Sequence, residues 1–181
     1  MPEPFIALLR AVNVGGGGKL PTKTFVQILN DLKLQSVSTY IQTGNAVFLG
    51  AKKDKAKQPA RIAAAIDDAC GFKPDVIVLT LDEIAQIIES NTIAAPDLNA
   101  SRLFVHFLTS KPAKPDLAKL DSLLLPSEQY ALTDKALYFY APDGVAPSKA
   151  YGRIEKLLGV TATARNWRTT CKLRDMAKAI A

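Results

Sequence analysis

An unbroken apolar run opens the chain and predicts a strand buried on both faces, at residues 5–9. Four glycines follow it, and then an amphipathic stretch at residues 21–32 carries apolar side chains at helical spacing. Two β-rich runs come next, at residues 37–41 and 46–49. The Thr-Gly-Asn sequence at residues 43–45 predicts a tight hairpin between them.

The remainder of the first half continues with a loop, a helix and a strand. The polar run 52–58 is typical of a solvated loop, residues 62–69 have helical periodicity, and residues 76–79 form another β-rich run. Thr80 precedes Glu83 by three residues, which is the spacing of a capping box at the start of a further helix. The first half therefore follows a βαββαβ plan with a trailing helix.

The second half repeats this order with little residue identity to the first. Its strands are expected at residues 103–108, 130–132, 136–140 and 160–164, and its helices at residues 116–125, 151–158 and 167–180. Each half matches the ferredoxin-like plan. The sequence thus predicts an α+β fold of tandem ferredoxin-like subdomains, residues 1–91 and 101–181, joined where Asn, Pro and Ala cluster at residues 91–101.

This topology brings two polar, glycine-bearing segments to one edge. In a ferredoxin-like sheet the first two strands run parallel with the third between them. The loop after the first strand, residues 10–19, then emerges beside the hairpin turn at residues 42–45. We expect the two segments to lie close together.

Charge is unevenly placed along the chain. Of the 181 residues, 23 are basic and 17 acidic, which gives a net charge of +6. Residues 149–181 alone hold eight basic and two acidic side chains, so the rest of the chain is neutral. This distribution favours a local anion-binding surface over general affinity for polyanions.

Other compositional features restrict the class of protein. The two cysteines are too few for a disulfide scaffold, and no apolar run approaches the length of a membrane-spanning helix. The N-terminus lacks the positive segment of a secretory signal. The sequence predicts a cytoplasmic protein without membrane contact, whose cofactors and oligomeric state it leaves open.

Three ordered motifs carry a family resemblance. They are LLRAVNVGGGGK at residues 8–19, TYIQTGNAVF at residues 39–48 and TARNWRTTCKL at residues 163–173. Together they resemble a widespread bacterial family, the domain-of-unknown-function family sixteen-ninety-seven. The chain departs from the family pattern at Ala11, Thr22 and Thr43. The resemblance implies a two-subdomain α+β fold, and no activity, cofactor or catalytic residue.

The glycine-rich loop is the first candidate site. Consecutive glycines let backbone N–H groups approach an anion, and the following helix N-terminus adds a positive dipole. The loop lacks the pattern of a Walker A motif and the setting of a dinucleotide fold. The alternative is a flexible turn beside a solvated lysine. The residues expected to bind a small phosphate- or carboxylate-bearing ligand are Arg10, Asn13, Gly15, Gly16, Gly17, Gly18, Lys19, Gly44 and Asn45.

The C-terminal segment is the second candidate site. Asn166 is a good N-cap, and Arg165, Arg168 and Lys172 recur at helical spacing, which predicts one shared face near a helix N-terminus. Such a face suits an anion or, as the alternative function, RNA or DNA. A solvated basic face anchored in the core by Trp167 also explains the pattern and is the preferred interpretation.

No side chain presents recognisable catalytic machinery. His106 is the only histidine, which excludes a multi-histidine metal site, and its place in a strand favours a satisfied structural role. Cys171 reads as an inert thiol. Tyr138 and Tyr140 occupy a position where RNA-recognition modules carry stacking aromatics, but the rest of that module's consensus is missing, so packing is expected. Catalytic residues stay unknown, and no metal site is predicted.

Overall fold

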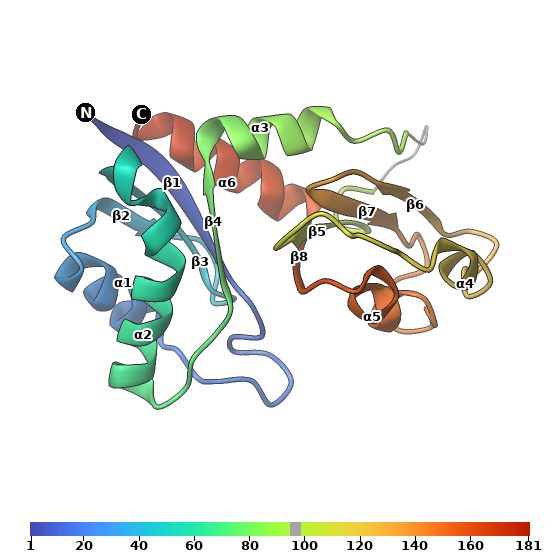
Figure 1. Ribbon diagram of the computed structural model, residues 1–181, viewed down its shortest axis with the longest axis horizontal. Coiled ribbons are helices and arrows are strands. Elements are labelled where there is room, and N and C mark those ends of the chain that lie inside the picture. The colour runs from blue at the N-terminus through green and yellow to red at the C-terminus, as the bar shows by residue number, and fades with distance from the viewer. Residues whose placement is uncertain (95–98) are drawn as a thin grey trace. The chain divides into compact units, whose positions relative to one another are not determined.

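The computed structural model describes residues 1–94 and 99–181. The chain forms two compact units, one made of residues 1–85 with 172–181 and the other of residues 86–171. Each unit contains a four-stranded antiparallel sheet, and the described residues include six α-helices (Figure 1). The predicted α+β class with two similar halves is confirmed.

The first unit orders its strands β2-β3-β1-β4. Its elements along the chain are β1 (Pro2–Leu9), α1 (Thr22–Asp31), β2 (Gln35–Thr39), β3 (Asn45–Ala51), the 3₁₀ helix η1 (Lys52–Lys57), α2 (Gln58–Cys70) and β4 (Val76–Thr80). Helix α3 (Leu81–Glu89) follows directly and continues into the second unit.

The second unit orders its strands β6-β7-β5-β8. Its elements are β5 (Leu103–Leu108), α4 (Leu117–Asp121), β6 (Gln129–Leu132), β7 (Ala136–Tyr140), η2 (Tyr151–Arg153), α5 (Ile154–Leu158) and β8 (Ala162–Asn166). Helix α6 (Trp167–Ala179) begins in this unit, and its last residues belong to the first unit.

The core of the first unit forms where α1 and α2 cover one face of the sheet (Figure 1). Phe5 and Phe48 come from neighbouring strands, with ring centroids 5.9 Å apart. Leu29 of α1 and Ile66 of α2 are fully buried against this face. The helices sit there because their apolar side chains recur at helical spacing and need a sheet face to cover them.

The other face of β1 is also shielded from water. Ile6 and Leu8 have no exposed surface, so the prediction that this face would be covered is confirmed. The first unit includes the start of α3 and the end of α6, which contribute the buried side chains of Ile84 and Leu173. The end of the chain's last helix, which the sequence had assigned to the second half, therefore belongs to the first compact unit.

The second unit has its own core. Leu137 and Phe139 of β7 pack with Leu120 of α4 and with Ile154 and Leu158 of α5. The short helices α4 and α5 therefore take the place that α1 and α2 hold in the first unit.

Local signals in the sequence fix several helix ends. The capping box forms as predicted: the Glu83 N–H donates to Thr80 Oγ1 at 3.1 Å, and the Thr80 N–H donates to Glu83 Oε2 at 2.9 Å. Gly71 and Gly159 end their helices in the left-handed conformation, with φ of 72° and 69°.

Other local predictions were wrong in detail. The polar run 52–58 is mostly a 3₁₀ helix and not a loop, and α4 ends at Asp121 instead of Leu125. The hairpin loop spans residues 40–44 and is longer than the tight turn predicted. The last strand lies at Ala162–Asn166, two residues later than expected. Turn residues indicate the ends of helices and strands less sharply than periodicity indicates the helices and strands themselves.

The predicted linker, residues 91–101, lies partly outside the described residues. The two compact units divide the chain elsewhere, within α3 and within α6. No helix in the described part of the chain is long and apolar enough to cross a membrane.

Candidate functional site

The loop after β1 and the turn after β2 meet at one end of the first sheet, as the topology predicted. The Leu9 N–H donates to the Gly44 carbonyl at 2.8 Å, which joins the two segments directly. Strand β3 lies between β1 and β2 and is antiparallel to both. This arrangement puts the glycine-rich loop and the hairpin turn side by side.

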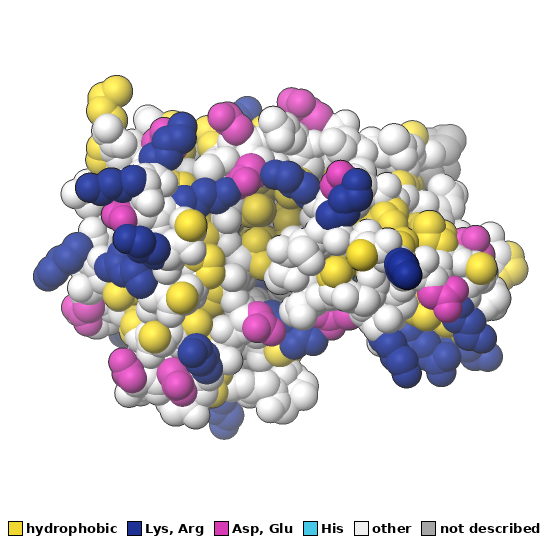
Figure 2. All heavy atoms as spheres, in the orientation of Figure 1, with side chains coloured by type: hydrophobic (Ala, Val, Ile, Leu, Met, Phe, Trp, Pro, Cys, Tyr) yellow, Lys and Arg dark blue, Asp and Glu magenta, His cyan; other side chains and the backbone are white. Residues whose placement is uncertain are grey.

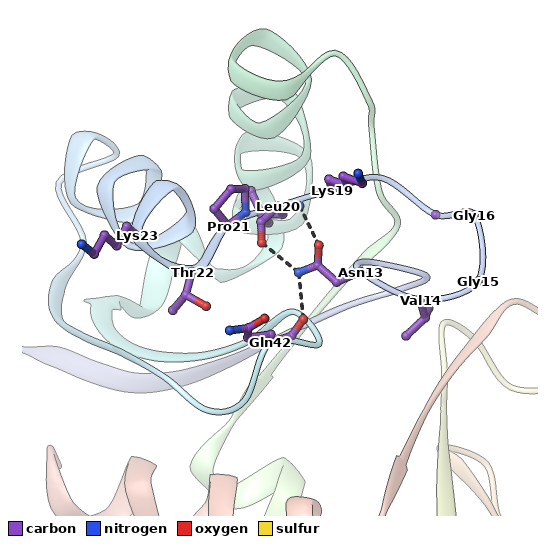
Figure 3. A pocket seen from close by; sticks show the side chains of 11 residues that line it. Asn13, Val14, Gly15, Gly16, Lys19, Leu20, Pro21, Thr22, Lys23 and Gln42 are labelled. Carbon is purple, nitrogen blue, oxygen red and sulfur yellow. Dashed lines mark hydrogen bonds between the residues drawn. The ribbon is translucent and has the colours of Figure 1, made fainter.

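Asn13 holds this loop in shape. Its Nδ2 donates to the carbonyls of Leu20 and Gln42, both at 2.8 Å, and its Oδ1 accepts the Leu20 N–H at 2.8 Å (Figure 3). The side chain therefore closes the glycine loop onto itself and ties it to the hairpin turn. The sequence had assigned Asn13 to orienting a ligand, but both donors of its amide are engaged by backbone carbonyls.

Two of the glycines are required by close packing. A Cβ added at Gly17 would lie 1.8 Å from the Ala11 carbonyl oxygen, and one at Gly18 would lie 2.2 Å from the Phe72 ring. The Gly17 N–H donates to the Val14 carbonyl at 2.8 Å, so it is not available to a ligand. These two glycines allow the loop to fold back on itself.

The other two glycines form the exposed tip. Gly15 and Gly16 have φ of 41° and 87°, and a Cβ at either would meet nothing within 4 Å. Their backbone N–H groups donate to no residue in the described part of the chain. The tip therefore provides the free donors that the sequence assigned to all four glycines.

Three further predicted residues, Arg10, Gly44 and Asn45, make contacts within the protein. Arg10 lies 3.8 Å from Asp75 across an exposed ion pair. Asn45 is 1% exposed, and its Nδ2 donates to the Tyr40 carbonyl at 3.1 Å and to Thr43 Oγ1 at 3.0 Å. Gly44 is buried with φ of 71°, and a Cβ there would lie 2.6 Å from Leu9 Cβ. These contacts give Arg10, Gly44 and Asn45 structural partners around the turn.

A cavity of about 810 Å³ opens between the glycine loop and the start of α1 (Figure 3). Its lining includes five of the predicted residues, Asn13, Gly15, Gly16, Gly17 and Lys19. It does not include the other four, Arg10, Gly18, Gly44 and Asn45. The structure therefore keeps most of the glycine loop in the candidate site, and places Arg10, Gly18, Gly44 and Asn45 outside its lining.

The sequence reasoning missed the opposite wall of this cavity. Thr22 and Lys23 from the first turn of α1 line it, together with Gln42 from the hairpin turn. Figure 3 shows Lys19 and Lys23 on either side of the segment that leads into α1, with Gln42 across from them. The signal was present in the predicted helix start, because the first turn of a helix that follows a short loop must lie beside that loop.

Helix α1 begins without the usual side-chain cap. Pro21 occupies the N-cap position, no side chain in the described part of the chain accepts from the first turn, and no acidic residue lies in that turn. The first N–H groups of the helix thus lack side-chain acceptors and carry the positive end of the helix dipole.

The second candidate site is not assembled as predicted. Arg165 lies in β8 and not in the terminal helix, is 9% exposed, and donates to Thr163 Oγ1 at 2.9 Å and to the Ala164 carbonyl at 2.7 Å. Burial lowers the pKa of Arg165 to about 10. Asn166 does cap α6, accepting the Thr169 N–H at 2.8 Å. Only Arg168 and Lys172 are exposed, so the shared basic face of three residues was wrong.

His106 and Tyr138 are buried in the second unit. Burial lowers the pKa of His106 to about 4, and His106 Nε2 has no hydrogen-bond partner in the described part of the chain, which corrects the expectation of a satisfied histidine. Tyr138 has no exposed surface, and its hydroxyl donates to the Ile87 carbonyl. Tyr138 therefore packs in the interior, as predicted, and offers no stacking surface for a base.

A family model described as a protein of unknown function, DUF1697, matches residues 3–138. The chain belongs to the DUF1697 family. The match includes the glycine-rich loop and the hairpin turn, so the lining of the cavity lies within the family region. No curated protein matches the chain.

A solved structure shares the fold of this family member over almost its whole length. It is described as a conserved bacterial protein, SP0830, from Streptococcus pneumoniae. The TM-score is 0.74 at 22% sequence identity, covering 98% of this chain and 99% of the other. This likeness supports the fold and makes no statement about a ligand.

Proposed function

We propose that the first unit binds a small anionic ligand in the cavity between the glycine loop and α1. The observation that carries this proposal is the charge of the lining, which among the described residues contains Lys19 and Lys23 and no acidic side chain. An uncompensated pair of cations around a concave surface attracts an anion and disfavours a neutral or cationic ligand.

Backbone donors support the same ligand class. The first turn of α1 has no side-chain cap, and the N–H groups of Gly15 and Gly16 have no acceptor among the described residues. A phosphate or carboxylate group placed between them would accept from the loop tip and from the helix start. Lys19 and Lys23 would then add charge-assisted hydrogen bonds.

The size of the cavity limits the ligand. A volume of about 810 Å³ lies within the range of metabolite sites and is far more than a single phosphate ion fills. Val14, Leu20 and Pro21 add apolar surface to the lining. The geometry therefore favours a small molecule with one anionic group and an apolar or aromatic remainder.

Removing either lysine should weaken anion binding without melting the unit. With pyrophosphate as the probe in titration calorimetry, Lys19→Gln and Lys23→Gln should each raise Kd roughly tenfold, because each removes a charge-assisted hydrogen bond. Both side chains are exposed, so the melting temperature should stay within a degree or two of the unaltered protein.

Lys73→Gln provides the matched control, since Lys73 is exposed in the same unit and does not line the cavity. It removes the same charge and should leave the affinity unchanged. Equal weakening in all three variants would mean that pyrophosphate responds only to net charge, and the proposed site would be wrong.

The alternative function is binding of RNA or DNA by the basic C-terminal helix. Arg168 and Lys172 are both exposed and one turn apart, which leaves two of the four residues assigned to this surface available to a phosphate backbone. On the face drawn in Figure 2, acidic side chains lie among several of the lysine and arginine side chains. Nucleic-acid binding would be recognised by a steep loss of affinity with salt.

We also infer that each unit has the ferredoxin-like plan. Support comes from the βαββαβ element order and from the two strand orders, in which the first strand of each unit lies between its third and fourth.

A further inference from the structure

A second cavity, of about 510 Å³, lies at the opposite end of the first sheet from the glycine loop. It opens where β1 begins and β3 ends, beside Pro2 and Ala51, which pair across the sheet. The end of α1 and the start of α2 close its other sides. The cavity is separate from the site proposed above, because the two share no lining residue.

A buried carboxamide lines this cavity. Gln58 is 1% exposed, and its Oε1 accepts from Arg61 Nη1 at 3.3 Å. Its Nε2 donates to no residue in the described part of the chain. Nε2 is not one of the fully buried polar atoms without a partner, so it keeps exposed surface, and on a cavity wall that surface is open to an acceptor supplied from outside the chain.

Arg61 is exposed and makes two hydrogen bonds beside this amide. Its Nη2 donates to the Leu32 carbonyl at the end of α1 at 3.1 Å, and its Nη1 donates to Gln58. These bonds cap α1 structurally, but they use only two of the five N–H donors of the guanidinium. The remaining donors form a positioned cationic group on the cavity wall, of the planar kind that matches a carboxylate.

Lys33 adds a second cation at an unusual backbone position. It follows α1 with φ of 62°, a left-handed conformation in which glycine is the usual residue. The Lys33 side chain is exposed and lines the cavity, where Asp54 is the one acidic residue among the described residues of the lining. The lining therefore has a net positive charge.

We propose that this second cavity binds a small ligand bearing a carboxylate next to a carbonyl or hydroxyl oxygen. The guanidinium of Arg61 takes the carboxylate, the idle Nε2 of Gln58 donates to the neighbouring oxygen, and Lys33 supplies the second charge. A carboxylate suits the site because Arg61 and Gln58 present donors side by side.

The probe is citrate, which carries a hydroxyl beside a carboxylate, and the signal is the side-chain amide resonance pair of Gln58 in a ¹⁵N–¹H spectrum. A saturable shift of this pair is expected. Lys33→Gly should weaken citrate binding roughly tenfold by removing a charge. It should also raise the melting temperature, because glycine relieves the left-handed conformation.

Lys57→Gln is the matched control, since Lys57 is exposed on the neighbouring η1 and does not line the cavity. It should leave citrate affinity unchanged, and so should Lys19→Gln in the other cavity. Arg61→Gln should abolish binding, and Lys33→Gly tests the same assignment if that variant fails to fold. Absence of a saturable Gln58 shift, equal weakening by Lys33→Gly and Lys57→Gln, or tighter binding of inorganic phosphate than of citrate would each overturn the proposal.

Discussion

Replacing Gly17 by alanine is expected to destabilise the first unit by about 3 kcal/mol, at the upper end of the range for overpacking. The added Cβ would lie 1.8 Å from the Ala11 carbonyl oxygen and 3.0 Å from that of Val14. Both atoms belong to the backbone, so the loop must open to make room. Opening would break the bonds through which Asn13 closes the loop. Urea denaturation followed by circular dichroism measures the loss.

Gly15→Ala is the matched control for this prediction. It makes the same chemical change in the same loop, but its Cβ meets nothing within 4 Å. Only the left-handed φ of 41° opposes it, at a cost of about 1 kcal/mol. If both variants lose the same stability, the tight fold of the loop base described above is incorrect.

Replacing His106 by leucine is expected to remove a large part of the loss of stability in acid. His106 lies under η2, with its ring centroid 5.1 Å from that of Tyr151, and Glu155 of α5 is the charged group that acts on it. Burial lowers the pKa of His106 from 6.5 to about 4, and the charge of Glu155 opposes this effect only in part. The folded protein therefore resists protonation that the unfolded chain accepts.

The direction of the pH dependence of stability follows from this difference in the His106 pKa between the folded and unfolded states. Above pH 6.5 the histidine is neutral in both states, and it contributes no pH dependence. As the pH falls from 6.5 to 4 the unfolded chain gains a proton first, so the free energy of unfolding falls by about 3 kcal/mol in total. The leucine variant should lack this component. It should also be at least as stable as the unaltered protein at neutral pH, because it removes a buried nitrogen without a partner.

Urea midpoints at about pH 7.5 and about pH 4.5 test this, since acidic residues that titrate in both proteins cancel in the comparison. Tyr151→Phe keeps the ring above His106 and serves as the control, which should retain the histidine component. Parallel loss of stability in the unaltered protein and the leucine variant would show that His106 can be protonated without unfolding.

The strand and helix pattern was predictable because it depends on side-chain periodicity and on short capping signals. Thr80 and Glu83 form the predicted capping box, and Gly71 ends α2 as expected. The predicted shared face of Arg165, Arg168 and Lys172 was wrong because their spacing does not show whether the helix starts at residue 165 or at Trp167. Where a strand runs directly into a helix, as β8 runs into α6, periodicity does not locate the junction.

The candidate site was predictable in place but not in detail. Strand order alone brought the glycine loop beside the hairpin turn. Which glycines form the exposed tip and which pack closely against other atoms depends on distances that a sequence does not contain. Asn13 was assigned to a ligand because its amide donates and accepts, and the same property lets it bind the backbone at Leu20 and Gln42. Lys23 was overlooked because its role depends on where α1 begins relative to the loop.

The most direct test of anion binding at the glycine loop is to observe the backbone donors themselves. A titration with pyrophosphate, followed in ¹⁵N–¹H spectra at constant ionic strength, should shift the amide resonances of Gly15, Gly16, Thr22 and Lys23 saturably and with one Kd. These amides line the cavity from both walls. Titration with sodium chloride should not reproduce the effect. If the four amides fail to shift, or shift only in proportion to salt, the cavity does not bind an anion and the central claim is wrong.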